Sequence, residues 1–157
     1  MEPLVIKKYP DKILRNECVK VEEITERERE LFEKMLFTMR RFRGIGLAAP
    51  QIGISKTLIV AEVEERTIKL ADPEIVEVKG IDRMVEGCLS VPDFTVEIER
   101  PYEVVAKGLS EEGKNIQIKA EGLLARVLQH EIDHLNGKLI IDYMGLFRRI
   151  KFHFRKR

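Results

Sequence analysis

Apolar residues recur at helical spacing in the segment that follows Thr25, at Leu31, Met35, Met39 and Phe42. A repeat of three to four residues places such side chains on one face of a helix. Thr25 and Glu28 form the T-x-x-E pattern of a capping box, which satisfies free polar groups at a helix start. The pattern therefore predicts an N-terminal helix that begins at Thr25 and ends near Gly44.

The middle of the chain is rich in Val and Ile, with Gly, Pro and Asp between the apolar runs, which is typical of strands and turns. The predicted strands cover Thr57 to Val63, Ile68 to Val78, Val96 to Lys107 and Asn115 to Ala120. Gly113 lies in a hairpin-type turn before the last of them. Short turns between strands imply antiparallel pairing.

A second helix is predicted from about Glu121 to Asn136, where Asn136-Gly137 is suited to the left-handed conformation that ends helices. A third helix is predicted from about Gly145. The order of helix, strands and helix describes an α+β fold, in which antiparallel β-sheets pack around a central helix, with an N-terminal and a C-terminal helix. A chain of 157 residues suggests that residues 1–157 form a single domain.

Composition narrows the class of protein. Hydrophobic residues make up 44% and charged residues 35% of the chain, which excludes a disordered tail and a membrane protein. The two cysteines, Cys18 and Cys88, are too few for a disulfide framework and indicate a reducing compartment. The first ten residues resemble no signal peptide, and no apolar run reaches the roughly 20 residues that span a bilayer. We therefore expect a cytoplasmic protein without a membrane partner.

Charge is distributed unevenly along the chain. Residues 145–157 carry six Lys or Arg and no acid, whereas 22 basic and 27 acidic residues precede them. A basic tail on an acidic body suggests contact with an anionic partner, although many such tails are only solvated helix faces.

The most informative residues are His130-Glu131-Ile132-Asp133-His134, an H-E-x-x-H motif within the second predicted helix. Residues at i and i+4 share a helix face, so both imidazoles can bind one metal ion with Glu131 beside it as a base. A motif extended by a third histidine is excluded, because Ile140 stands at that position. The candidates for a third ligand are Asp142, His153 and Cys88, which lies in a predicted tight turn over residues 86–90. Three protein ligands would leave one position open for water.

Three segments, taken together, resemble the motifs of the bacterial peptide deformylases. They are Gly44-Ile45-Gly46-Leu47-Ala48-Ala49-Pro50-Gln51, Glu86-Gly87-Cys88-Leu89-Ser90 and Gln129-His130-Glu131-Ile132-Asp133-His134. Their order and approximate separations also fit, and the resemblance covers nearly the whole chain. This family removes the formyl group from the N-terminal methionine of nascent chains and releases formate.

The resemblance implies a role for individual residues. Cys88, His130 and His134 would hold one divalent metal ion, and Glu131 would be the general acid and base. Gln51 and the backbone N–H of Leu89 would donate hydrogen bonds to the formyl oxygen. The chemistry is consistent. A divalent ion brings the pKa of bound water near neutrality, so that this water can attack the formyl carbon. Hydrogen-bond donors that are already in place then stabilise the negative charge on the formyl oxygen.

Further residues would contact the peptide: Ile45, Gly46, Gly87, Leu123 and Val127. Small residues before Gln51 let a bound peptide approach closely and pair as an added strand. Leu123 and Val127 precede His130 at helical spacing on the same face and suit an unbranched apolar side chain such as methionine. Core packing is the alternative explanation for both. Arg126 stands where some family members have an apolar residue, and Glu86 is expected to pair with Arg100 and stabilise the turn that carries Cys88.

The resemblance implies Fe(II) in the cell, while one cysteine and two histidines also suit Zn(II), Ni(II) or Co(II), any of which the isolated protein can contain. The expected partners are the formyl-methionine N-termini of nascent peptides, and no binding to DNA is expected. We hypothesise ribosome contact through the basic C-terminal helix, by way of Arg148, Arg149, Lys151, Arg155, Lys156 and Arg157.

Two alternatives compete with this interpretation. A zincin-like metallopeptidase would use the same helix with Asp142 or His153 as its third ligand, but it leaves the segments around Gly46 and Cys88 without a role. A structural-metal module that binds RNA would explain the tail but not Glu131.

Overall fold

The computed structural model describes residues 1–145, so the predicted C-terminal helix and the basic tail lie outside the described residues. The described elements are, in chain order, α1 (Glu26–Arg41), β1 (Gly46–Ala48), β2 (Leu58–Val63), β3 (Arg66–Lys79), β4 (Asp82–Cys88), β5 (Val91–Arg100), β6 (Glu103–Leu109), β7 (Asn115–Glu121) and α2 (Gly122–Leu135). Short 3₁₀ helices cover Lys12–Arg15, Ala49–Ile52 and Ile140–Tyr143. This is the predicted α+β fold.

Helix α1 begins with the predicted capping box. The Thr25 hydroxyl oxygen accepts a hydrogen bond from the backbone of Arg27, and the Glu28 carboxylate accepts from Thr25 N at 3.0 Å. The helix ends at Arg41, earlier than predicted, so Phe42 is its C-cap residue and is exposed rather than part of the buried stripe. Met35 and Met39 are fully buried, as the periodicity indicates.

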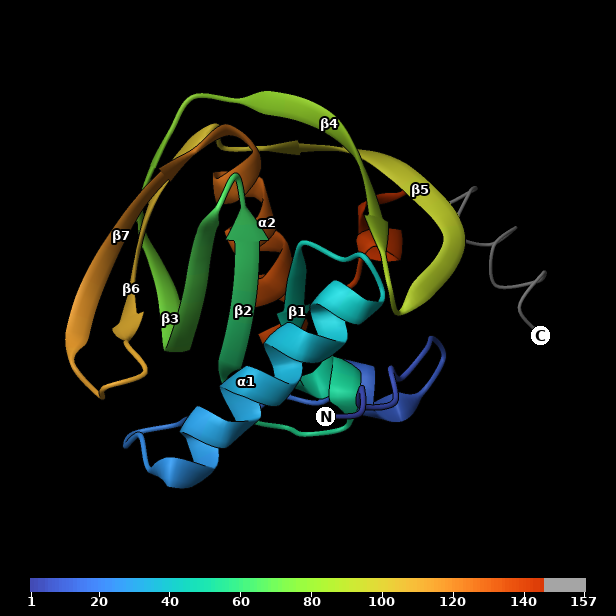
Figure 1. Cartoon of the computed structure of the whole chain (residues 1–157). Helices are drawn as coiled ribbons and strands as arrows, with labels where there is room; N and C mark the ends of the chain where they lie inside the picture. The colour runs from blue at the N-terminus through green and yellow to red at the C-terminus, as the bar shows by residue number, and fades with distance from the viewer. Residues whose placement is uncertain (146–157) are drawn as a thin grey trace.

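Five antiparallel strands form one sheet in the order β1-β2-β3-β6-β7, and α1 and α2 cover opposite faces of it at β2 (Figure 1). Leu58 and Val60 pack in the cluster that contains α1, whereas Ile59 packs in the cluster that contains α2. Because both faces of β2 are covered, its sequence is a continuous apolar run instead of an alternating one. The predicted hairpin is present, since β6 pairs with β7 and Gly113 has a φ of +79°.

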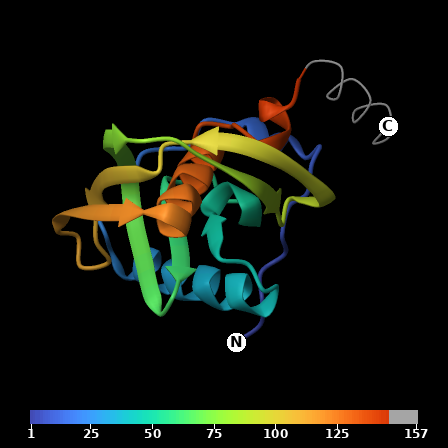
Figure 2. The ribbon, with the colours of Figure 1, turned by 90° about the horizontal axis from the view of Figure 1, so that it is seen from above.

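Helix α2 lies at the centre of the molecule, with strands around it (Figure 2). It ends one residue before Asn136, and Gly137 has a φ of +73°, the left-handed conformation that the Asn-Gly pair predicts. Its apolar face, which includes Leu124 and Leu128, packs on residues of β2, β3, β6 and β7. The five-stranded sheet therefore supplies a rigid support for the helix that carries the H-E-x-x-H motif.

Two predictions about the middle of the chain are wrong. Residues 96–107 form parts of two strands, because the chain leaves β5 at Pro101, which has no N–H for a ladder, and enters a different sheet at β6. Residues 86–88 are the end of strand β4 rather than part of a tight turn, and only Leu89 and Ser90 form the turn to β5. Together β4 and β5 make a separate two-stranded sheet, which arches over α2 (Figure 2).

Within residues 1–145, no helix is both long enough and apolar enough to cross a membrane.

The capping box predicts a measurable contribution to stability. We expect Thr25→Ala to lower the free energy of unfolding by about 1 kcal/mol, because the first turn of α1 loses its side-chain acceptor. Thr25→Ser keeps the hydroxyl and is the matched control. Urea unfolding of the three proteins checks this, and equal midpoints for the alanine variant and the wild type would contradict it.

Candidate metal centre

Three potential metal ligands, two on α2 and one at the end of β4, converge on one point. The ligand atoms of Cys88, His130 and His134 lie within 4.8 Å of one another. Cys88 Sγ is 3.4 Å from His134 Nε2, which is 3.3 Å from His130 Nε2. These separations match the roughly 3.3–3.7 Å between two donors on a tetrahedral ion with bonds of about 2.0–2.3 Å. One soft thiolate and two imidazoles at this spacing fit a transition-metal ion.

The ligands come from two elements that the sequence places far apart. His130 and His134 lie one helix turn apart on α2, and Cys88 is the last residue of β4. Burial lowers the pKa of His134 well below its usual range, which keeps its ring in the neutral form that binds metals. Of the other candidate ligands, Asp142 does not join this group, because it is hydrogen-bonded to Arg15 and to Leu139 N, and His153 lies outside the described residues.

Glu131 is buried next to the ligands, and its Oε1 has no hydrogen-bond partner among the described residues. Burial raises the pKa of this carboxyl to about 7. The carboxylate lies against strand β1 at Gly46, where a Cβ would collide with it and come within 2.7 Å of Val127 Cγ1. Glycine at position 46 therefore allows the strand to approach the helix closely.

Gln51 presents its amide N–H groups toward the same centre. Its Oε1 accepts a hydrogen bond from Ala48 N at 2.9 Å, which directs Nε2 to Ser90 Oγ at 3.2 Å and toward Cys88 Sγ at 3.7 Å. Leu89 follows Cys88 directly, and its side chain lies so close to Gly44 that a Cβ there would be 2.9 Å from Cδ1. The segments around Gln51 and Leu89 thus flank the ligands from two sides.

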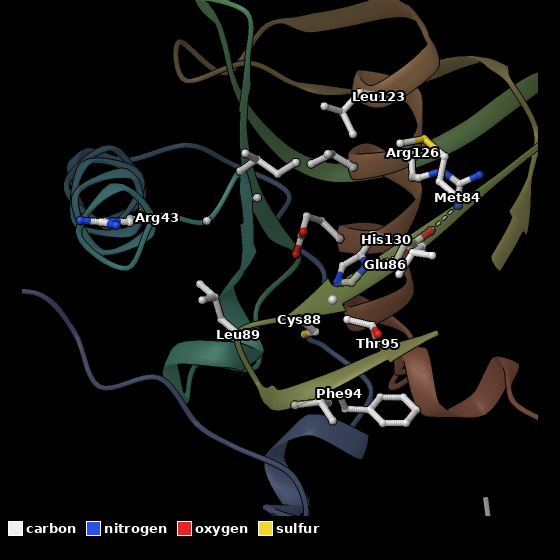
Figure 3. A pocket seen from close by; sticks show the side chains of 18 of the residues that line it. Arg43, Met84, Glu86, Cys88, Leu89, Phe94, Thr95, Leu123, Arg126 and His130 are labelled. Carbon is white, nitrogen blue, oxygen red and sulfur yellow. Dashed lines mark hydrogen bonds and ion pairs between the residues drawn. The ribbon is translucent and has the colours of Figure 1, made fainter. Parts of the chain in front are cut away.

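A cavity of about 550 Å³ brings the predicted site residues together (Figure 3). All of them except the buried ligand His134 line it: Ile45, Gly46, Gln51, Gly87, Cys88, Leu89, Leu123, Val127, His130 and Glu131. Val127 is buried, whereas Leu123 is 40% exposed and is therefore not a core residue. The lining is mainly apolar.

Glu86 contacts one of the ligands and the expected arginine. Its carboxylate accepts hydrogen bonds from Arg100 at 2.6 and 3.0 Å and lies 2.8 Å from His130 Nδ1. Burial alone would raise the pKa of this carboxyl, but the hydrogen bonds with His130 and Arg100 outweigh it and lower the pKa to about 2. The pairing of Glu86 with Arg100 is as predicted.

Sequence reasoning missed several neighbours of this network. Arg126 donates to the Glu86 carboxylate. Asp133 accepts from Arg100 at 3.0 Å and from the Tyr143 hydroxyl at 2.6 Å, which its position in the sequence does not indicate. Met84 and Phe94 also line the cavity. The only local signal was the position of Arg126 one turn before His130.

Comparison with known proteins is consistent across sequence and structure. A family model described as Polypeptide deformylase matches residues 3–149. A peptide deformylase of Halothermothrix orenii is 49% identical over 90% of this chain and 94% of that protein, and one of Thermodesulfovibrio yellowstonii is 46% identical over 97% and 95%. The crystal structure of a peptide deformylase of Ehrlichia chaffeensis in complex with actinonin superposes with a TM-score of 0.94 at 37% identity, covering 99% of this chain and 96% of that one.

The contact between Gly46 and Glu131 predicts a steric effect. We expect Gly46→Ala to lower the free energy of unfolding by about 1–3 kcal/mol, because the methyl group must displace Glu131 or Val127 in a packed interior. Gly87→Ala is the control from the same cavity, since its methyl group would meet Thr95 only at an ordinary contact of 3.8 Å. Chemical denaturation distinguishes the two, and equal losses of stability would refute this account of Gly46.

Proposed function

The chain belongs to the polypeptide deformylase family, and on that premise we propose that Cys88, His130 and His134 hold its metal ion while Glu131, Gln51 and Leu89 act on the substrate. The protein is a metal-binding hydrolase that removes the formyl group from the N-terminal formyl-methionine of nascent polypeptides. The observation that supports these residue roles is the convergence of three ligand atoms beside a carboxylate oxygen of Glu131 that has no hydrogen-bond partner within residues 1–145.

Each side chain has a defined task in this proposal. The ion, when bound, polarises the formyl carbonyl and makes water a stronger nucleophile at neutral pH. Glu131 Oε1 accepts a proton from the attacking water and returns it to the departing amine, so that the C–N bond breaks to give formate and a free N-terminus. Gln51 Nε2 and the Leu89 N–H donate to the formyl oxygen as negative charge develops there.

The peptide is held by the cavity walls and by β1. This strand is at the end of the five-stranded sheet and pairs only with β2 within the described chain, so its other edge is available for the substrate backbone near Ile45 and Gly46. Leu123 and Val127 form an apolar wall for the methionine side chain, and Gly87 lines the same cavity.

The ion in the cell is, in our proposal, Fe(II), on the strength of the family resemblance. The thiolate and imidazole donors also accept Zn(II), Ni(II) or Co(II), which makes these ions useful substitutes in the isolated protein. We also propose that residues 1–157 form one catalytic domain, supported by the family match over residues 3–149. The cytoplasm, where nascent chains are made, is the proposed location.

Replacing the proposed acid and base tests the mechanism. In protein loaded with Fe(II) or Ni(II) without oxygen, we expect Glu131→Gln to retain the metal but to release formate from a formyl-Met peptide about 10²–10⁴-fold more slowly. The control is Glu97→Gln, an exposed residue on β5 that is expected to leave the rate unchanged. A folded, metal-loaded wild type that releases no formate would refute the proposal, as would a fully active Glu131→Gln.

The six basic residues between Arg148 and Arg157 are proposed to bind ribosomal RNA. Removing residues 148–157 is expected to reduce co-sedimentation with ribosomes most at low salt, because contacts with phosphates weaken as salt rises. Deformylation of a short peptide serves as the control for an intact active site. Unchanged co-sedimentation of the shortened protein at low salt would exclude the tail as the contact.

A further inference from the structure

The proposed metal ligands belong to two parts of the fold that share no strand ladder. Cys88 lies in the two-stranded sheet of β4 and β5, whereas both histidines lie on α2, which packs on the five-stranded sheet. The β4–β5 hairpin also forms one wall of the cavity, from Met84 to Thr95. The geometry of the metal site and the width of the cavity therefore depend on how this hairpin is held against α2.

Arg126 connects α2 to both strands of the hairpin. Its Nη2 donates to the Asp82 carbonyl on β4 at 2.7 Å, and its Nη1 donates to the Ile98 carbonyl on β5 at 2.9 Å. Nη1 also donates to Glu86 Oε2 at 2.5 Å. The side chain is only 4% exposed, so water does not compete for these hydrogen bonds.

A second arginine makes the reciprocal connection. Arg100 lies on β5 and donates to Asp133 on α2 at 3.0 Å, in addition to its two hydrogen bonds with Glu86. Glu86 therefore accepts from one guanidinium on the helix, that of Arg126 (Figure 3), and from one on the hairpin, that of Arg100. Its Oε1 also contacts His130 Nδ1, which directs Nε2 of that ring toward Cys88 and His134.

We propose that Arg126 is a positioning residue of the metal centre: by holding the β4–β5 hairpin on α2 it sets the place of Cys88 relative to the two histidines and the width of the substrate cavity. It touches no ligand atom itself and acts through Glu86 and through the backbone of β4 and β5. The inference rests on the proposed function, because it assumes that Cys88, His130 and His134 bind the ion.

The geometry requires arginine rather than any cation. Three acceptors on two strands are reached by two nitrogens in one plane, which a planar guanidinium provides and a single ammonium nitrogen does not. Lysine would keep the positive charge beside Glu86 but lose some of the hydrogen bonds to the hairpin backbone. Methionine would fill much of the space, yet it would leave the buried Ile98 carbonyl, the half-buried Asp82 carbonyl and the Glu86 carboxylate without this donor.

The test uses Co(II), whose visible absorption reports the number and arrangement of its ligands, including a thiolate. Wild type, Arg126→Lys and Arg126→Met are loaded without oxygen, and the Co(II) dissociation constant is measured by competition with a chelator. Arg83→Met is the matched control, because Arg83 lies on the same hairpin but is exposed and pairs only with glutamates of β5 in the described chain. KM and kcat for a formyl-Met peptide are measured on the same samples.

We expect both Arg126 variants to bind Co(II) at least about tenfold more weakly, with altered visible bands and a higher KM, while Arg83→Met matches the wild type. If Arg126→Met fails to fold, the decision rests on Arg126→Lys, which retains the buried charge. Wild-type affinity and spectrum in folded Arg126→Lys would overturn the inference, even if its stability is reduced, because Arg126 would then be a packing residue only. A wild type that binds no Co(II) through Cys88 would instead overturn the proposed metal site, and the inference with it.

Discussion

The buried carboxylate of Glu86 is the charge around which the metal centre is organised. Two guanidiniums, from Arg100 and Arg126, surround it, and its other oxygen orients the ring of His130. Removing one partner of a buried ion pair typically costs about 3–5 kcal/mol, because the remaining charge is left without compensation. The group of Glu86, Arg100 and Arg126 is therefore stable only when the β4–β5 hairpin and α2 are both in place. The arrangement of the metal centre thus depends on the folding of both elements.

One secondary-structure element cannot supply all three of the proposed ligands. A helix can supply two ligands one turn apart, but a third ligand that comes equally close to both must come from outside the helix. The end of β4 brings the Cys88 sulfur to that position, and the turn that follows places Leu89 beside Gly44. The five-stranded sheet, with both faces of β2 covered, gives α2 a fixed position from which the hairpin is held.

Close approach of backbone to side chain is the second constraint at the site. Gly46 leaves room for Glu131 and Val127, so an edge strand, the proposed base and the proposed apolar wall lie in contact with one another. A larger residue at position 46 would have to displace the side chain of Glu131 or Val127. In the proposed function, the same glycine serves both packing and access of a peptide to the edge of β1.

The sequence by itself determined the elements that depend on local patterns. The capping box of α1, the hairpin at Gly113 and the pair of histidines on α2 are set by neighbours within a few residues, so periodicity and turn chemistry predict them. The choice of Cys88 over Asp142 came from resemblance, and only the fold shows that Asp142 is engaged by Arg15. Strand β4 was missed because it is mostly exposed and carries charged residues and a glycine, which hide a strand pattern.

The tertiary structure alone decided where Arg126 points and which partners Asp133 has. Both residues lie on α2 within about one turn of His130. Helix periodicity predicts which face of the helix each occupies, but not which segment of the protein packs against that face. Their partners, Asp82, Ile98 and Arg100, are separated from them by tens of residues and lie on a hairpin whose position follows from packing of the whole domain. Contacts of that range leave no trace in local spacing, which is why the support of the metal centre became visible only in the fold.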